Sequence, residues 1–470
     1  MTREKWMQLA AGPLLFMLCG LFLPPVFTLE QSYAVGTTLW MGAWWIFRPV
    51  SITVTAFLPI AINALFNLVP MQSVISNYFA EIVVLLLGSD LICMTWTQTG
   101  LDRRMSLKAL CYIGPSVKQQ IFVWFTAATV LSIFLPNVVV CTLFIPIAIK
   151  MLAFLGVKDI GASRLAVPIL LAIVWGAGIG GFGSPLGGAA NLVAIAYLEQ
   201  ITGHEFMYLD WISRFTLPLM LVMALNLSVL WRIRTGRAKL PGSREYFESS
   251  YAELPAMGRD EWIAAGLFLV AMVLAFVRPL YAELFPALKP AYVFMIGGLL
   301  TFMIPRKDGR PFCTWRYAEK DVMWGMLFLF AGGLALGTIV TQTGAAERIA
   351  ELITTLPLKG GIETLFVFNV FSVVLTEISS NTAAAAIAIP VVATIVDAMN
   401  LNPIGYIYVT IIAVNCAYVL PVSIRAIAVG SGLDPKQMFR HGLSLSMATV
   451  LLITVVGYAM MTLWPGFGEG

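Results

Sequence analysis

A weak internal repeat is the feature that most constrains this sequence. Residues 376–390, TEISSNTAAAAIAIP, recur in altered form 244 positions earlier as residues 132–146, SIFLPNVVVCTLFIP. The same offset carries Asn137 onto Asn381 and Gly88 onto Gly332, and it relates the TQTG at 97–100 to the TQTG at 341–344. Because separated landmarks share one offset, we expect a chain that is built twice from one plan.

The composition places this repeat in a membrane. The 470 residues are 59% hydrophobic and 11% charged, whereas soluble proteins carry roughly 25% charged residues. Long continuous apolar runs exclude a β-barrel. We therefore expect an all-α polytopic membrane protein with about eleven transmembrane helices. The first apolar run, residues 9–27, is too long for a signal peptide and should be a retained helix.

Basic residues predict the orientation of the two halves. Arg3 and Lys5 favour a cytoplasmic N-terminus in the cell membrane. Basic residues flank residues 121–150 on both sides, so this segment should be a re-entrant hairpin that enters from the cytoplasm and turns at Pro136-Asn137. Residues 363–398 should form a matching hairpin from the outside, turning at Ser380-Asn381.

These orientations divide the chain into a first half over residues 1–231, a cytoplasmic linker over 232–259 and a second half of inverted topology over 260–470. Glycines and prolines should break one further segment in each half, at residues 176–188 and around 421–425. Broken helices at matching places in an inverted repeat indicate a secondary transporter with its site near the membrane midplane.

Four segments carry a resemblance to a known family. They are SSNT at 379–382, its weaker partner PNV at 136–138, GGFGSPLGGAAN at 180–191 and CAYVLPVS at 416–423. With these, essentially the whole chain resembles the divalent anion:sodium symporter family. The resemblance implies a homodimer in which a transport domain moves like an elevator against a scaffold. It also implies citric-acid-cycle dicarboxylates or citrate as substrates, held at the hairpin tips, with sodium bound nearby.

The residue types suit such a site. Short hydroxyl and amide side chains at a hairpin turn, together with helix N-termini, hold a carboxylate without many full charges. We expect the substrate to contact Asn137, Gly188, Ser380, Asn381, Thr382 and Arg425. Hydroxyl and carbonyl oxygens suit sodium, so the candidate ion-site or coupling positions are Ser132, Gly187, Thr376, Glu377 and Ser423.

Two departures from the family pattern lead to a hypothesis about coupling. In the first tip, Pro136 and Val138 stand beside Asn137 where the family has hydroxyls. Both breaks lack the family's Thr-Pro-Pro run, and the second places Arg425 there, where it would repel sodium and grip a carboxylate. We therefore favour sodium-independent carboxylate exchange, because an empty carrier with an unpaired buried cation should be reluctant to move. Sodium-coupled dicarboxylate symport is the alternative.

Other interpretations remain open for these residues. Polar side chains in membrane helices often only bond a neighbouring helix, Arg425 could pair with an acid or extend to the surface, and Glu377 could be structural or coupling. Asp90 is expected to tie helices together. An enzyme is disfavoured because no Ser/His/Asp, HExxH or Cys/His pattern is present, and a channel because no charged rings are visible. We expect no organic cofactor and no nucleic-acid partner. The expected partners are the carboxylate substrate, a second copy of the chain and membrane lipid, with sodium in the case of symport.

Overall fold

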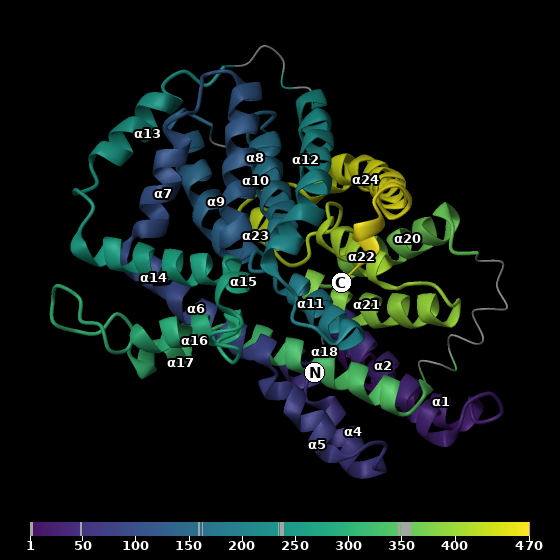
Figure 1. Cartoon of the computed structure of the whole chain (residues 1–470). Helices are drawn as coiled ribbons and strands as arrows, with labels where there is room; N and C mark the ends of the chain where they lie inside the picture. Colours follow the sequence, from purple (N-terminus) through teal and green to yellow (C-terminus); the bar gives the residue numbers. More distant parts are fainter. Residues whose placement is uncertain are drawn as a thin grey trace.

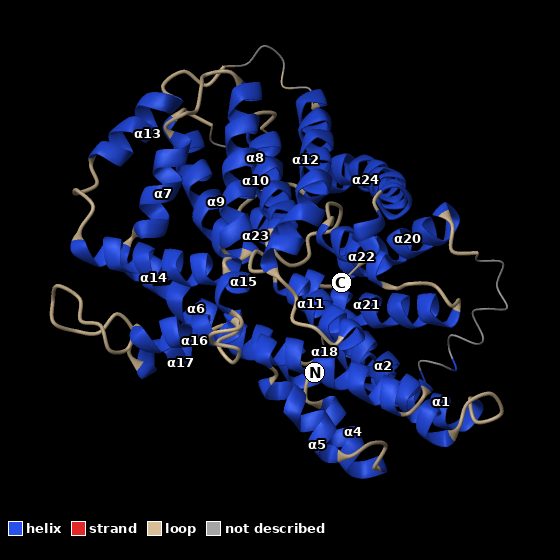
Figure 2. Ribbon diagram, in the orientation of Figure 1, coloured by secondary structure: helices blue, strands red, loops and turns tan. Residues whose placement is uncertain are grey.

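The computed structural model consists of helices and connecting loops (Figure 1), and Figure 2 shows no strand in the part of the chain that it describes. The described part is residues 3–469 without 48, 158–159, 162, 234, 236–238, 346–347 and 349–358. Within these ranges, nine helices are long and apolar enough to cross a membrane.

The first half contains twelve α-helices and two short 3-10 turns. In chain order these are α1 Arg3–Phe22, α2 Leu29–Phe47, α3 Ile52–Thr55, α4 Leu58–Phe66, α5 Met71–Ile75, η1 Ser76–Phe79, α6 Glu81–Thr99, α7 Leu101–Leu110, α8 Val117–Phe134, α9 Asn137–Phe154, α10 Ala166–Gly180, η2 Gly181–Gly183, α11 Ala189–Thr202 and α12 Tyr208–Arg232.

The rest of the described chain continues in the same manner. Its elements are α13 Ser243–Ala252, α14 Arg259–Phe276, α15 Arg278–Tyr281, α16 Pro290–Leu300, α17 Trp315–Asp321, α18 Trp324–Gln342, α20 Ile362–Ile378, α21 Asn381–Ala398, α22 Ile404–Asn415, α23 Arg425–Gly430, α24 Pro435–Leu463 and η3 Pro465–Gly468.

The helices form two groups that meet around the centre of the molecule (Figure 1). One group, the hairpin bundle, comprises α8–α12 and α20–α24; within it α8 packs on α10, α20 on α24 and α11 on α21. The other, the outer group, comprises α1–α6 and α14–α18, in which α6 packs on α16 and α14. Helix α18 joins the groups, because it contacts α21 of the hairpin bundle and α2, α3 and α5 of the outer group.

The two predicted hairpins are present and share one register. Helices α9 and α21 have the same length, and each begins at the asparagine of its motif, Asn137 and Asn381, which lie 244 positions apart. The turns therefore fall one residue earlier than expected, at Leu135-Pro136 and Ser379-Ser380. Proline cannot donate a backbone hydrogen bond, so it suits the N-cap position of α9. Ser380 caps α21 through its side chain, which accepts from the N–H of Ala383 at 3.2 Å.

The two predicted breaks are present with different bounds. Residues 176–180 remain helical, because Gly176 and Gly180 let α10 approach α8 closely: a Cβ on Gly180 would lie 2.3 Å from the carbonyl oxygen of Thr129. The first break is thus residues 184–188, after the 3-10 turn η2. The second break starts earlier than predicted and covers residues 416–424. Small residues at the α8–α10 contact are the usual way in which membrane helices pack tightly.

Two polar stretches between the apolar segments contain short helices. The linker over 232–259 contains α13, which packs on α7, and its Phe247 is buried against Trp124 of α8 with ring centroids 5.7 Å apart. Residues 234 and 236–238 of this linker lie outside the described residues. The segment that follows the first TQTG is the ten-residue helix α7. Both short helices bury one face against neighbouring helices.

Candidate functional site

The tips of both hairpins carry the same internal hydrogen bond. At the first tip the hydroxyl of Ser132 lies 2.8 Å from Asn137 Oδ1, and at the second the hydroxyl of Thr376 donates to Asn381 Oδ1 at 3.0 Å. Both hydroxyls are fully buried. A hydroxyl one turn before the tip therefore fixes each asparagine, so that its amide group is oriented at the start of the returning helix.

The first break lies against the first tip. A Cβ on Gly187 would lie 2.6 Å from the carbonyl oxygens of both Gly181 and Ser132 and 3.0 Å from that of Ile133. Only glycine fits at this point, and three backbone carbonyl oxygens converge on it. Convergent carbonyls are the type of ligand that sodium takes from unwound membrane helices.

Two asparagines that the sequence analysis missed connect the tip of the second hairpin to both breaks. Asn415 is the last residue of α22. Its Oδ1 accepts from Asn381 Nδ2 at 3.4 Å, and its Nδ2 donates to Asn191 Oδ1 at 3.1 Å. Asn191, in the first turn of α11, donates to the carbonyl oxygens of Gly181 at 2.6 Å and Ser184 at 2.8 Å. Both side chains are buried. Each asparagine lies beside an unwound stretch within an apolar run, and this position in the sequence could have identified both as candidate site residues.

A cavity of about 970 Å³ opens where the tips and breaks meet. Seven predicted site residues line it, namely Asn137, Gly187, Gly188, Ser380, Asn381, Thr382 and Ser423. Ser132 and Thr376 lie one hydrogen bond behind this surface. The outer group closes the opposite wall with Lys5, Thr53, Ser89, Asp90 and Met326, among others. The cavity therefore lies between the hairpin bundle and the outer group.

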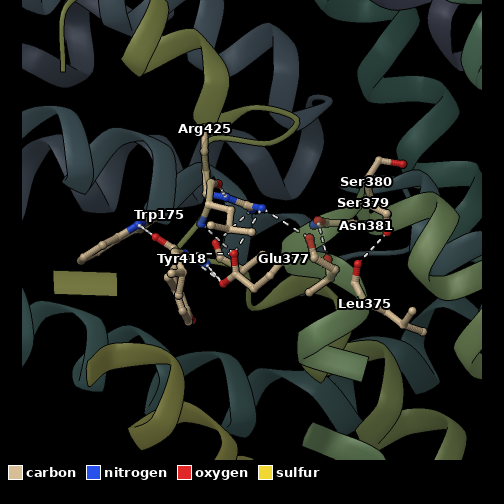
Figure 3. A network of polar contacts seen from close by, with 12 residues as sticks. Trp175, Leu375, Glu377, Ser379, Ser380, Asn381, Tyr418 and Arg425 are labelled. Carbon is tan, nitrogen blue, oxygen red and sulfur yellow. Dashed lines mark hydrogen bonds and ion pairs between the residues drawn. The ribbon is translucent and has the colours of Figure 1, made fainter. Parts of the chain in front are cut away.

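Glu377 and Arg425 lie together outside the residues that line this cavity (Figure 3). The Glu377 carboxylate accepts the backbone N–H groups of Tyr418, Val419 and Leu420 at 2.6–3.0 Å, and Arg425 pairs with it at 3.6 Å. Arg425 also donates to the carbonyl oxygens of Leu420 at 2.6 Å and Ala417 at 3.2 Å. The expectation that Arg425 is unpaired is therefore wrong, the alternative that it pairs with an acid holds, and Arg425 is not among the residues that line the cavity. That expectation failed because the acid that partners Arg425 lies 48 positions away in sequence.

The comparisons with known proteins decide the family. The citrate transporter family model matches residues 43–413, which is most of the chain. The chain belongs to the citrate transporter family. This membership makes it a multi-pass membrane transporter and not an enzyme, and the prediction of an all-α polytopic membrane protein is confirmed.

The similarity to individual relatives covers nearly the whole chain of this citrate transporter family member. The sodium-dependent dicarboxylate transporter SdcS of Staphylococcus aureus strain RF122 is 28% identical over 97% of this chain and 91% of its own length, and SdcS of strain NCTC 8325 gives the same values. The crystal structure of the YdaH transporter of Alcanivorax borkumensis is similar with a TM-score of 0.54 at 12% identity, covering 93% of this chain and 98% of that one. The last comparison supports the fold alone.

Asp90 has the helix-tying contact that the sequence predicted for it. Its Oδ2 accepts the backbone N–H of Met323 at 2.8 Å, which fixes the start of α18 to α6. Asp90 also lines the cavity, so this citrate transporter family member has a carboxylate and Lys5 on the wall formed by the outer group. In the described part of the chain, no cluster of three His, Cys, Asp or Glu side chains could hold a metal ion.

Asn191→Ala is expected to lower the melting temperature, because the carbonyl oxygens of Gly181 and Ser184 would lose their buried donor at a cost of about 1–3 kcal/mol each. Thermal unfolding of the purified protein measures this. The control is Asn402→Ala, which removes an exposed bond to Gly468 and a part-buried bond from the N–H of Ile404, and it should change stability less because neither bond is fully buried. If the two variants unfold at the same temperature, Asn191 does not hold the first break in place.

Proposed function

We propose that this chain is a secondary transporter that carries a di- or tricarboxylate together with sodium, using the cavity between the hairpin tips. The observation that carries this proposal is the convergence of Asn137, Ser380, Asn381 and Thr382 on one cavity from the N-terminal ends of α9 and α21. Amide and hydroxyl donors at two helix N-termini favour anions with two or more carboxylates. The family match and the dicarboxylate relative support this substrate class.

The choice of sodium symport over exchange reverses the preference drawn from the sequence. That preference depended on an unpaired Arg425, and Arg425 is buried with Glu377 as its partner. The carbonyl oxygens around Gly187 and the hydroxyls of Ser132 and Thr376 supply oxygens of the kind that sodium prefers. The name of the SdcS relative, a sodium-dependent transporter, supports the same choice.

The position of the cavity supports a proposal for the transport cycle. We take the hairpin bundle as the moving part and the outer group as the scaffold of an elevator, with the two halves of the chain in inverted topology, the N-terminus in the cytoplasm of a cell-membrane protein and two copies per carrier. The shared register of the hairpins supports the repeat, and the placement of the cavity between the two groups supports the division into a moving bundle and a scaffold. Helix α18 would then contain the surface along which the bundle slides.

Uptake of labelled succinate into proteoliposomes tests the coupling. An inward sodium gradient is expected to drive uptake into vesicles that contain only buffer, and replacing sodium by potassium should abolish it. Citrate, malate and 2-oxoglutarate in tenfold excess would report the substrate class by competition. Uptake only into vesicles preloaded with carboxylate, and indifferent to sodium, would contradict symport and restore exchange.

A further inference from the structure

A second cavity lies away from the candidate transport site, at one end of the hairpin bundle. It has a volume of about 610 Å³ and is formed by the approach to α10, the end of α12 and the first turns of α24. Its lining residues are Gly161, Ser163, Arg164, Val167, Arg232, Ile233, Gln437, Arg440 and His441. Three segments that are far apart in the sequence thus each contribute at least one arginine.

The charge of this cavity, the basic pocket, is one-sided. Arg164, Arg232 and Arg440 are exposed, and no aspartate or glutamate is among the lining residues. In the described ranges, their guanidinium groups make no ion pair or hydrogen bond. Arg104, Arg278 and Arg425, in contrast, each pair with a carboxylate within 3.6 Å. Unpaired arginines that surround a cavity from three elements are arranged to share an anion.

The backbone adds to this potential. Helices α10 and α24 begin at the basic pocket and α12 ends there, so two positive dipole ends and one negative end lie at the pocket and the balance is positive. Ser163 and Asp434 already accept N–H groups in the first turns of α10 and α24. The direct hydrogen bonds to an anion would therefore come mainly from the arginines, because each planar guanidinium can donate two parallel hydrogen bonds to phosphate oxygens.

We propose that the basic pocket binds a phosphate group, supplied by an anionic phospholipid headgroup or by a soluble phosphate. The surface beside the pocket favours the lipid. Phe439, Leu443 and Met447 follow one another at helical spacing on α24 and are 49%, 45% and 64% exposed. A headgroup in the pocket would leave its acyl chains along this apolar stripe. Basic pockets between the ends of membrane helices are known to hold such headgroups.

Thermal unfolding and native mass spectrometry of the detergent-purified chain test the proposal. Phosphatidylglycerol is expected to raise the melting temperature and to remain bound in the mass spectrum, whereas phosphatidylcholine should do neither. The double variant Arg232→Gln/Arg440→Gln should bind at least roughly tenfold more weakly, since each arginine supplies a charge-assisted bond. Both side chains are exposed and unpaired, so this variant should unfold like the unmodified protein when no anion is added.

Arg316→Gln is the matched control, because Arg316 is an exposed arginine on α17 outside the pocket. It should keep the full response to phosphatidylglycerol. A response to millimolar inorganic phosphate or pyrophosphate that the double variant loses, without a response to lipid, would support the proposal with a soluble ligand. If no phosphate compound stabilises the protein, or if Arg316→Gln loses as much binding as the double variant, the arginines act only as general positive charge and the proposal is wrong.

Discussion

Asn381→Asp is expected to abolish carboxylate uptake while the protein still folds. The substitution keeps the size of the side chain, and the new carboxylate still accepts the hydroxyl of Thr376 as Asn381 Oδ1 does at 3.0 Å. It places a negative charge where we propose that the substrate carboxylate binds. Two like charges about 4 Å apart repel by about 4 kcal/mol near a protein surface, which is about a thousandfold in binding.

Uptake of labelled succinate and stabilisation of the detergent-purified variant by millimolar succinate measure this effect. Asn67→Asp serves as the control: Asn67 is exposed at the end of α4 with φ of 50°, a conformation that aspartate also adopts, and it is not part of the cavity. Uptake near the unmodified level in Asn381→Asp would remove the second tip from the substrate site.

Glu377→Ala is expected to cause the largest loss of stability. It would leave Arg425, which is 1% exposed, without its carboxylate, and three backbone N–H groups of residues 418–420 without an acceptor. Removing one partner of a buried ion pair costs about 3–5 kcal/mol. The melting temperature and the yield of folded protein in detergent should both fall markedly.

A second substitution separates the charge effect from the loss of the backbone bonds. Glu377→Ala/Arg425→Ala should be more stable than the two single changes predict together, because no unpaired charge remains. For comparison, Glu81 and Lys289 form a pair whose side chains are 44% and 35% exposed, so Glu81→Ala should cost less than about 1 kcal/mol. Equal costs for Glu377→Ala and Glu81→Ala would show that the buried pair does not hold the second break.

The sequence predicted the hairpins because their signal is local. The polar motifs in apolar runs lie near residues 137 and 381, and the basic residues that flank the first hairpin lie close to it in sequence. The offset of 244 positions made each hairpin evidence for the other. The candidate substrate residues Asn137, Ser380, Asn381 and Thr382 were found for the same reason, and all four line one cavity.

The partners of Arg425 and Asn381 were not predictable in this way. Glu377 neutralises Arg425 only because the second break folds back over the end of α20, and Asn191 reaches Asn415 only because α11 crosses beside α22. Such contacts depend on how helices are placed in space, which neither spacing nor composition specifies. The predicted start of the first break was wrong for the same reason. The glycines at 176–180 indicate a broken helix from the sequence alone, but they allow a regular helix α10 to pack tightly on α8.

The two tips differ in what they offer. Around Asn137 the first tip presents Pro136 and Val138 to the cavity, whereas Asn381 is flanked there by the hydroxyl residues Ser380 and Thr382. An anion held between them would therefore meet many donors at one end and few at the other. A molecule with unlike ends would bind in one direction, with its more highly charged end at the second tip. The wall of the outer group, which carries Asp90, would then be a third contact, and three unlike contacts distinguish the two mirror images of such a molecule.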